Sequence, residues 1–285
     1  MTSTMIEDAD RIGRYYEECH TSYRKWGSGV YAAFALHYGY WDATTARHED
    51  ALDAMNRLMA DQLDDLAGSR VLEAGCGVGS SALWLAGKRG AKVLGVSLSQ
   101  RQVNEAKDFA ESLGLGGSAE FRQSDYLQTG LEDEAIDAVW ALESMCYCME
   151  KSEFAREAFR LLRPGGQVVV ADGFNGSIPA GYYATAMRKL WLRGWRVPNL
   201  VMTEEFERNL RSVGFREIAT IDVTHNVLPS AREIFRRGVM GVPMYVATLK
   251  SRIRMAHLLG CIMQYPALVA GSWRYCVVSA RKPLS

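Results

Sequence analysis

The middle of the chain alternates short apolar runs with segments of helical spacing. The runs that predict strands are 70–74, 91–96, 119–123, 135–141 and 167–171, and helical spacing lies between them at 80–88, 99–113 and 151–162. A helix at 204–212 and strands at 217–223 and 274–280 complete the pattern. Strands that alternate with helices indicate βαβ units and a parallel sheet. We therefore expect an α/β fold with one seven-stranded, mostly parallel sheet covered on both faces.

Three stretches fall outside this alternation. Residues 1–60 have helical spacing and many aromatic side chains, and 174–202 and 229–270 hold Trp, Tyr, Met and Arg without strand patterning. We expect a helical cap over 1–60 and a main domain over 61–285 that carries the other two stretches as lid insertions. Open parallel sheets bind ligands at the carboxyl ends of their strands, so these additions are expected to lie there.

Composition narrows the class of protein. A chain of 285 residues can form one large α/β domain. Its formal net charge is zero, which gives no reason to expect a nucleic acid or an anionic membrane as partner. Six cysteines without C-x-x-C spacing fit free thiols in a reducing cytoplasm, and no run of about 18 apolar residues predicts a membrane span. We expect a cytoplasmic protein with a small-molecule partner, and homo-oligomerisation stays open.

A glycine-rich loop lies between the first strand and the following helix. Gly75, Gly77 and Gly79 follow Glu73 there, and glycine allows a ligand to approach the backbone closely. A dinucleotide fingerprint would read G-x-G-x-x-G with an acidic residue about twenty positions later. Here the spacing is G-x-G-x-G, and the segment 95–99 after the second strand holds no acid. The pattern favours a nucleotide-type cofactor other than NAD.

The ordered set of motifs resembles one enzyme family. Glu-x-Gly-x-Gly-x-Gly, followed by Gly-Val-Ser-Leu-Ser-x-x-Gln, resembles motif I and its successor in class I S-adenosyl-L-methionine (SAM)-dependent methyltransferases. The stretch Leu-Leu-Arg-Pro-Gly-Gly at 161–166 is similar to the turn before the fifth strand of that family. The resemblance covers roughly residues 68–172, and its Ser-Leu step is closest to the branch with cyclopropane-fatty-acid synthases and tocopherol and sterol methyltransferases. It implies a Rossmann-like fold, a transferase activity and SAM as cofactor.

The resemblance also assigns residues to the cofactor. The glycine loop would hold the methionine part of SAM, and Glu73 would orient the loop and the amino group. Residues after the second and third strands would meet the ribose and adenine, and two N-terminal residues would reach the carboxylate. The residues for the ribose and adenine are Ser97, Leu98, Gln102, Asp125 and Tyr126. The two for the carboxylate are Tyr16 and His37. For Asp125, a plain turn residue is the alternative.

The N-terminal segment is rich in aromatic side chains that resemble those of the same branch, in which such a segment closes over SAM. Tyr23, Trp26 and Tyr38 would exclude water from the transfer site and contact the acceptor. The alternative is that these rings only pack a helical cap.

The acceptor side of the site is predicted from the sequence after the fourth strand. Glu143 and Tyr147 form a Glu-Ser-x-x-Tyr pattern that resembles sterol and prenyl-diphosphate C-methyltransferases. A carboxylate at this position could stabilise a carbocation or take its proton. His225 is a candidate for a second acid-base group. The alternatives are a glutamate that caps a helix or orients a neighbour, and a structural histidine.

A basic and aromatic segment at 188–196 suggests what the acceptor carries. Arg188, Arg193 and Arg196 could bind diphosphate oxygens, and Trp195 could face a cation or a prenyl chain, with Tyr245 also in the pocket. A solvated helix face with core tryptophans is the alternative. The sequence shows no metal site of its own, so Mg²⁺ would enter only with a diphosphate substrate.

We expect SAM-dependent C-methylation of an alkene carbon in an isoprenoid, such as isopentenyl, geranyl or farnesyl diphosphate, through a carbocation, in isoprenoid biosynthesis or secondary metabolism. One alternative is an O- or N-methyltransferase of a small natural product. The other is a SAM-binding protein without methyl transfer.

Overall fold

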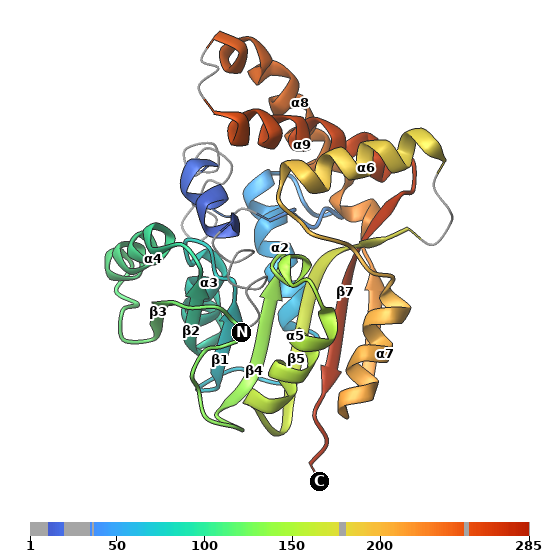
Figure 1. The fold of residues 1–285 in the computed structure, drawn as a ribbon. Helices are drawn as coiled ribbons and strands as arrows, with labels where there is room; N and C mark the ends of the chain where they lie inside the picture. Colours follow the sequence, from blue (N-terminus) through green and yellow to red (C-terminus); the bar gives the residue numbers. More distant parts are fainter. Residues whose placement is uncertain (1–10, 20–34, 36, 177–180, 248–250, 285) are drawn as a thin grey trace.

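The computed structural model describes residues 11–19, 35, 37–176, 181–247 and 251–284, with only the backbone at 244–247. Its centre is a seven-stranded sheet in the order β3-β2-β1-β4-β5-β7-β6 (Figure 1). The strands are β1 (Arg70–Ala74), β2 (Lys92–Ser97), β3 (Ala119–Gln123), β4 (Ile136–Leu142), β5 (Leu162–Asn175), β6 (Arg216–Asp222) and β7 (Trp273–Arg281). β1 to β5 pair in parallel, and β7 runs antiparallel to both β5 and β6. The expected seven-stranded, mostly parallel α/β sheet is confirmed.

The central strands are apolar on both faces because helices cover both. In β4, Val139 and Ala141 belong to one core cluster, while Ala138 and Trp140 belong to the other. Successive side chains of a strand point to opposite faces, so a continuous apolar run feeds two cores. One core includes α2 (His48–Ala60), α3 (Ser80–Arg89) and α4 (Gln100–Ser112), and the other includes α5 (Lys151–Leu161) and α7 (Thr203–Val213).

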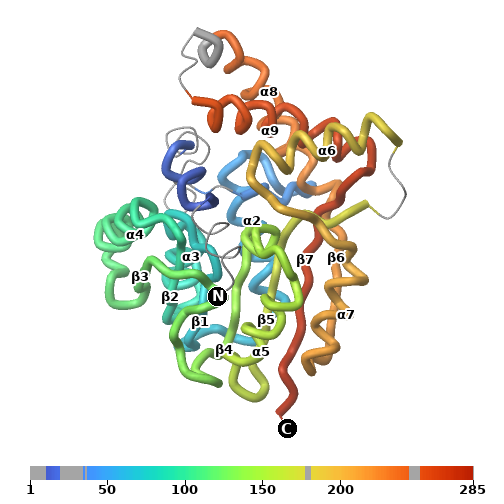
Figure 2. The backbone as a smooth tube through the Cα atoms, in the orientation of Figure 1, coloured from blue at the N-terminus to red at the C-terminus, as the bar shows by residue number. Residues whose placement is uncertain are grey.

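Three further helices form a layer over the carboxyl ends of the parallel strands: α6 (Tyr182–Gly194), α8 (Thr224–Ala247) and α9 (Arg252–Val269). We call them the lid, and Figures 1 and 2 show them stacked beyond the sheet, with the helical residues 11–19 between the lid and α4. α6 and α9 pack very closely at Gly194, where an added Cβ would lie 2.3 Å from the carbonyl oxygen of Ala256. None of the described helices is both long and apolar enough to cross a membrane.

Two elements begin five residues before the predicted strand and the predicted lid stretch to which they correspond. β5 begins at Leu162, directly after α5, instead of at residue 167. The Arg-Pro-Gly-Gly stretch stays extended because the N–H of Gly165 bonds the carbonyl of Lys282, and the N–H of Lys282 bonds the carbonyl of Gly166. The lid helix α8 starts at Thr224 rather than near residue 229, with Pro229 and Pro243 inside it.

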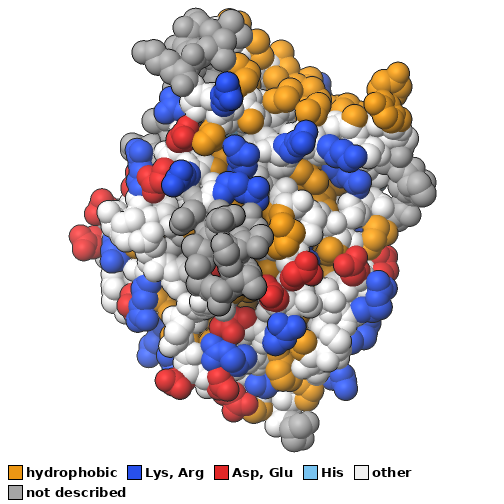
Figure 3. Space-filling view, viewed as in Figure 1, with side chains coloured by type: hydrophobic (Ala, Val, Ile, Leu, Met, Phe, Trp, Pro, Cys, Tyr) orange, Lys and Arg blue, Asp and Glu red, His pale blue; other side chains and the backbone are white. Residues whose placement is uncertain are grey.

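The surface of the lid carries exposed apolar side chains. Tyr182 and Tyr183 are 83% and 81% exposed at the start of α6, and Val239 and Met240 are exposed on α8. Figure 3 shows hydrophobic side chains gathered along the lid, above a lower half where acidic and basic side chains intermingle.

Candidate active site

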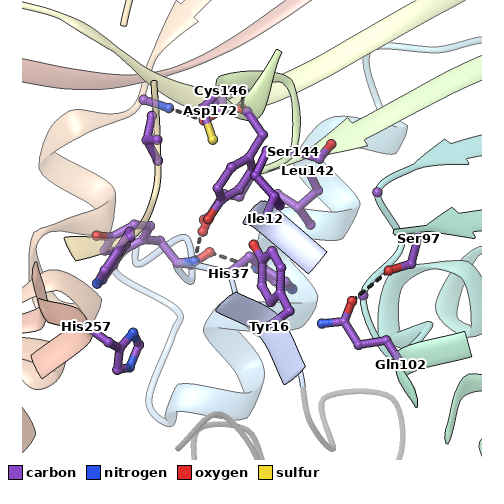
Figure 4. Close-up of a pocket in the computed structure, with 18 of the residues that line it drawn as sticks. Ile12, Tyr16, His37, Ser97, Gln102, Leu142, Ser144, Cys146, Asp172 and His257 are labelled. Carbon is purple, nitrogen blue, oxygen red and sulfur yellow. Dashed lines mark hydrogen bonds between the residues drawn. The ribbon is translucent and has the colours of Figure 1, made fainter. Parts of the chain in front are cut away.

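A cavity of about 690 Å³ lies between the carboxyl ends of the strands and the lid. Its volume falls within the roughly 300–1,000 Å³ that small-molecule sites occupy. Its described lining comes from the loops after β1, β2, β3 and β4, the upper parts of β5 and β7, the lid and the segment after α6. Four residues nearer the N-terminus complete it: Ile12, Tyr16, His37 and Tyr38. Figure 4 places Ser97 and Gln102 on one side of this cavity and His257 on the other, with Tyr16 between them.

The glycine loop is shaped by close contacts. Gly75, Gly77 and Gly79 have φ angles of 82°, 54° and 81°, a region that favours glycine. An added Cβ on Gly75 would lie 2.5 Å from the Cβ of Ser144, and one on Gly79 would lie 2.7 Å from the Phe121 ring. A side chain at either position would therefore displace a neighbour, and Gly75 and Gly77 line the cavity with backbone atoms.

Glu73 places a buried carboxyl group beneath this loop. The residue is 3% exposed, it lines the cavity, and among the described residues its Oε2 has no hydrogen-bond partner. Burial raises its pKa to about 8, although the backbone N–H of Ala82 acts in the opposite direction. A buried acceptor atom that faces a cavity needs a donor. This group fits the ammonium end of SAM.

The loop after β2 supplies hydroxyl and amide groups. The Ser97 hydroxyl donates to Gln102 Oε1 at 2.7 Å, and the Ser99 hydroxyl caps α4 by accepting from the N–H of Gln102. Ser97, Leu98 and Gln102 all line the cavity, and their contact with the ribose and adenine stays a prediction.

Of the two residues predicted after β3, only one lines the cavity. Tyr126 lines the cavity and donates its hydroxyl to the carbonyl of Ser144 at 3.1 Å. Asp125 is not among the lining residues, and its Oδ1 accepts from the N–H of Leu127 at 2.9 Å. The structure thus favours the turn interpretation of Asp125 over contact with adenine.

The helical residues 11–19 close one side of the cavity. Tyr16 lines it and packs its ring edge-on against Tyr147, with centroids 5.8 Å apart. The hydroxyl of Tyr15 lies 2.8 Å from Nδ1 of His257 in the lid. On the other side, the Ser99 hydroxyl donates to the carboxylate of Glu17. Tyr23 and Trp26, predicted in the same cap, lie outside the described residues.

His37 is buried at the cavity wall in a defined protonation state. Its Nδ1 lies 2.9 Å from the carbonyl of Tyr38, and since a carbonyl only accepts, Nδ1 carries the hydrogen. Burial lowers the pKa of the ring to about 4, so it is neutral at pH 7, with its lone pair on Nε2. The predicted contact of His37 with the SAM carboxylate would need a hydrogen on Nε2, and it stays a prediction.

Glu143 lines the cavity between the glycine loop and the aromatic side chains of Tyr38 and Tyr275. Its φ angle is 52°, and among the described residues both of its hydrogen bonds fall on Oε1. The backbone N–H of Tyr38 donates at 2.7 Å and the hydroxyl of Tyr275 at 2.8 Å. Burial raises the pKa of Glu143 to about 8, these bonds lower it, and nearby Asp172 raises it. The side chain therefore orients two tyrosine residues and does not cap a helix.

The lid half of the cavity is aromatic. Trp191, Trp195 and Trp273 line it, and the Trp195 ring stacks on His257 with centroids 6.5 Å apart. Burial lowers the pKa of His257 to about 4, so this ring is also neutral at pH 7. Sequence reasoning missed His257, since no motif surrounds it in α9, and it also missed Asp172 at the end of β5. Only the register of β5 and the fold of the lid bring them to the cavity.

The arginines predicted to bind a diphosphate do not line the cavity. Arg188 donates to Asn175 Oδ1 at 2.6 Å and to the carbonyl of Ser272 at 2.8 Å, Arg193 is exposed, and Arg196 is half-buried. Of the predicted segment, Trp195 does reach the cavity. The arginine prediction is wrong in this structure because the helix turns its tryptophans inward and its cations outward or onto carbonyls.

The remaining acceptor-side predictions have mixed outcomes. His225 is exposed on α8 and does not line the cavity, so the structure gives it no place in the chemistry. The side chain of Tyr245 lies outside the described residues. Tyr38 and Tyr147 do line the cavity. Among the described residues, no group of three or more His, Cys, Asp or Glu side chains could hold a metal ion.

Comparisons with known proteins point to methyltransferases. A family model described as a methyltransferase domain matches residues 72–170. The 27-O-demethylrifamycin SV methyltransferase of Amycolatopsis mediterranei is 34% identical over 195 residues, which are 68% of this chain and 71% of that protein.

Solved structures match over nearly the whole chain. The 4+2 cyclase SpnF superposes with a TM-score of 0.78 at 25% identity, with 97% of both chains covered. A geranyl diphosphate methyltransferase in complex with GPP and sinefungin gives a TM-score of 0.75 at 21% identity, with 97% of this chain and 99% of that one covered. At 21% identity, the second match supports a shared fold and no more.

Proposed function

This chain belongs to the class I SAM-dependent methyltransferases, and we propose that it methylates a hydroxyl oxygen of a bulky, mostly apolar natural product, with Glu143 as the proton acceptor. Bound SAM would supply a methyl group on a positively charged sulfur, which is already activated for attack by a nucleophile. The residues of the chain must hold the acceptor in line, exclude water and receive the proton of the hydroxyl.

The observation that carries this proposal is the placement of Glu143. Its carboxyl group lies at the junction of the glycine loop and the aromatic wall, and Tyr38 and Tyr275 hold it through Oε1. This arrangement leaves Oε2 as the oxygen that can receive a proton. A general base works best when its pKa lies near the working pH, and the pKa of about 8 at Glu143 meets that condition.

The acceptor class follows from the lid half of the cavity. Trp191, Trp195 and Trp273, with Val197 and Leu200, offer an apolar surface that suits a large hydrophobic body. The relative named above is, by its printed name, a methyltransferase of 27-O-demethylrifamycin SV. Both points support O-methylation, the natural-product alternative of the sequence analysis.

C-methylation of a prenyl diphosphate is the second candidate. A carboxyl group surrounded by aromatic rings, as Glu143 is by Tyr38 and Tyr275, would also suit a carbocation. However, Arg188, Arg193 and Arg196 do not line the cavity. Without them, the described residues offer a diphosphate only Arg237 and Arg254 at the lid, which already bond the Glu233 carboxylate and the carbonyl of Glu18.

An acceptor panel with methyl-labelled SAM tests the proposal. The panel contains 27-O-demethylrifamycin SV, phenols, amines, and isopentenyl, geranyl and farnesyl diphosphates. We expect label on a hydroxyl oxygen of the macrocyclic or phenolic acceptors. Label on the prenyl diphosphates alone would establish the second candidate instead. SAM binding in calorimetry without label on any acceptor would point to a SAM-binding protein that transfers no methyl group.

A further inference from the structure

Two buried charged residues hold the main chain at Cys146 through the two peptide groups that flank its Cα. The N–H of Cys146 donates to Asp172 Oδ2 at 2.8 Å, and the carbonyl of the same residue accepts from Lys151 Nζ at 2.9 Å. Both charged residues are nearly fully buried, at 2% and 3% exposure. Figure 4 shows the bond between Cys146 and Asp172 at the cavity wall. Charged groups are almost never buried this deeply without a specific set of partners.

Lys151 has its donors directed at this turn and at the segment beside it. Besides Cys146, its ammonium group bonds the carbonyl of Cys148, and Asn199 Oδ1 accepts from it at 2.8 Å. Asn199 in turn donates to the carbonyl of Met149 at 3.0 Å. The lysine therefore ties the short helix at Met145–Tyr147 to the chain that follows the lid helix α6. It does not line the cavity itself.

The clamped turn carries groups of the acceptor site. Cys146 and Tyr147 line the cavity, and Glu143 directly precedes the turn. The N–H of Glu143 bonds the carbonyl of Ala171 at 2.8 Å, next to Asp172 in β5. A shift of the turn would therefore move the carboxyl group proposed as base and the tyrosine ring that packs against Tyr16.

We propose that Lys151 and Asp172 form a buried positioning pair that fixes the turn at Cys146 and so aligns Glu143 and Tyr147 with the methyl acceptor. The role of Glu143 within it rests on the proposed O-methylation. Neither residue of the pair moves the proton in this arrangement; both act through the peptide they hold. A displacement of about 1 Å in such a site can cost roughly 10²-fold in rate.

Asp172 also affects the charge around Glu143. The groups that face it are Tyr16 from the N-terminal helix, Tyr38, Tyr275 from β7, Cys146 from the turn, and Asp172 from β5. Of these, Asp172 raises the pKa of Glu143 because it is an anion. Loss of that anion should shift the pH at which Glu143 ionises to lower values.

The experiment compares Lys151→Met and Asp172→Asn with Lys282→Met. Lys282 is a matched control, since it is also buried and donates to the carbonyls of Phe159 and Leu162 while bonding Glu134. It lies at the opposite end of the sheet and outside the cavity lining. All three full-length proteins are measured for SAM affinity, for the pH profile of kcat, and for hydrogen exchange of the peptide over 143–150.

We expect both site variants to lower kcat by about 10- to 10²-fold with little change in SAM affinity. Asp172→Asn should also move the rising limb of the kcat profile to lower pH. Exchange at 143–150 should quicken in both, and in Lys282→Met it should stay as in the unchanged protein. Equal kcat and exchange in the three variants would overturn the pair's role.

Hydrogen exchange separates this inference from the proposed function. If the unchanged protein methylates no hydroxyl, the kcat measurements lose their meaning, but faster exchange at 143–150 in the site variants still supports the clamp. If O-methylation holds and exchange is unaltered, the clamp is contradicted and the proposed function stands. Should Lys151→Met fail to fold, Lys151→Arg and Asp172→Asn carry the same measurements.

Discussion

At the scale of single residues, the site contains close backbone contacts and a residue with a strained backbone conformation. Gly75 approaches Ser144 so closely that even one methyl group does not fit, and Glu143 holds a left-handed backbone conformation. Strained positions of this kind persist when the surroundings stabilise them, and they cluster at functional sites. Two predictions belong here.

Gly75→Ala should destabilise the protein and weaken SAM binding. The φ of 82° costs about 1–2 kcal/mol for a residue with a Cβ, and the contact with Ser144 adds to this. Gly114→Ala is the matched control, because Gly114 has a φ of 68° and nothing within 4 Å of an added Cβ. Urea unfolding and calorimetry with SAM measure the difference. Equal losses in both variants would mean that the close approach at Ser144 has no cost.

Glu143→Gln should lower kcat at least about tenfold while SAM binding persists, because the amide cannot accept the proton. In the unchanged protein, kcat should rise with pH through about 8 as the carboxyl group ionises. The variant should lose this limb. Glu132→Gln, in an exposed loop, serves as the control. Unchanged turnover in Glu143→Gln would remove Glu143 as the base.

At the scale of elements, the helical residues 11–19 join the two halves of the cavity. Glu17 accepts from Ser99, the N-cap of α4 on the cofactor side, while Tyr15 bonds His257 of α9 on the lid side. One short helix thus contacts elements on both sides of the cavity. Its sequence signals aromatic packing, but the two polar contacts depend on where α4 and α9 lie.

Tyr15→Phe should raise KM for the acceptor by about 3- to 10-fold, the range expected for one lost hydrogen bond. The ring is kept, so packing stays, while His257 loses a partner at Nδ1. SAM affinity should change little because the lost bond lies on the lid side. Tyr265→Phe in α9, outside the cavity lining, is the control. A loss confined to SAM affinity would contradict this division of the cavity.

At the scale of the whole molecule, two buried carboxyl groups make stability depend on pH. The pKa values of Glu73 and Glu143 rise from 4.5 to about 8 on folding because burial disfavours the charged form. Between these values the unfolded chain binds fewer protons than the folded one. Their contribution to stability is therefore complete below about pH 4.5 and is lost as the pH rises through about 8.

Without SAM, the free energy of unfolding should fall between about pH 4.5 and 8, beyond what other groups cause. Glu73→Gln should flatten this fall, and saturating SAM should offset it in the unchanged protein, since an ammonium group beside Glu73 favours its ionised form. Chemical unfolding at several pH values, with and without SAM, measures both effects. An identical slope in Glu73→Gln would show that Glu73 is already ionised when SAM is absent.

The sequence predicts the cofactor half well because that half is built from neighbours along the chain. Gly75 to Gly79, Ser97 and Gln102 lie within single strand-loop-helix units, so local spacing indicates both the fold and the ligand. Asp125 shows the limit of such reasoning. Its neighbour Tyr126 lines the cavity, while the Asp125 carboxylate bonds the N–H of Leu127 in the turn. His225 and the arginines of α6 fail for a similar reason, because residue types alone do not say which side of a helix faces the cavity.

The sequence by itself determined the α/β sheet, the glycine loop and the family, since these follow from apolar periodicity and short motifs. Only the tertiary structure decided the acceptor half. It brings Glu143 after β4, Tyr275 of β7, Asp172 of β5 and His257 of α9 to one cavity, across separations of up to 132 residues for a single hydrogen bond at Glu143. The physical reason is that sheet register and lid packing, which no local pattern encodes, decide where these side chains meet.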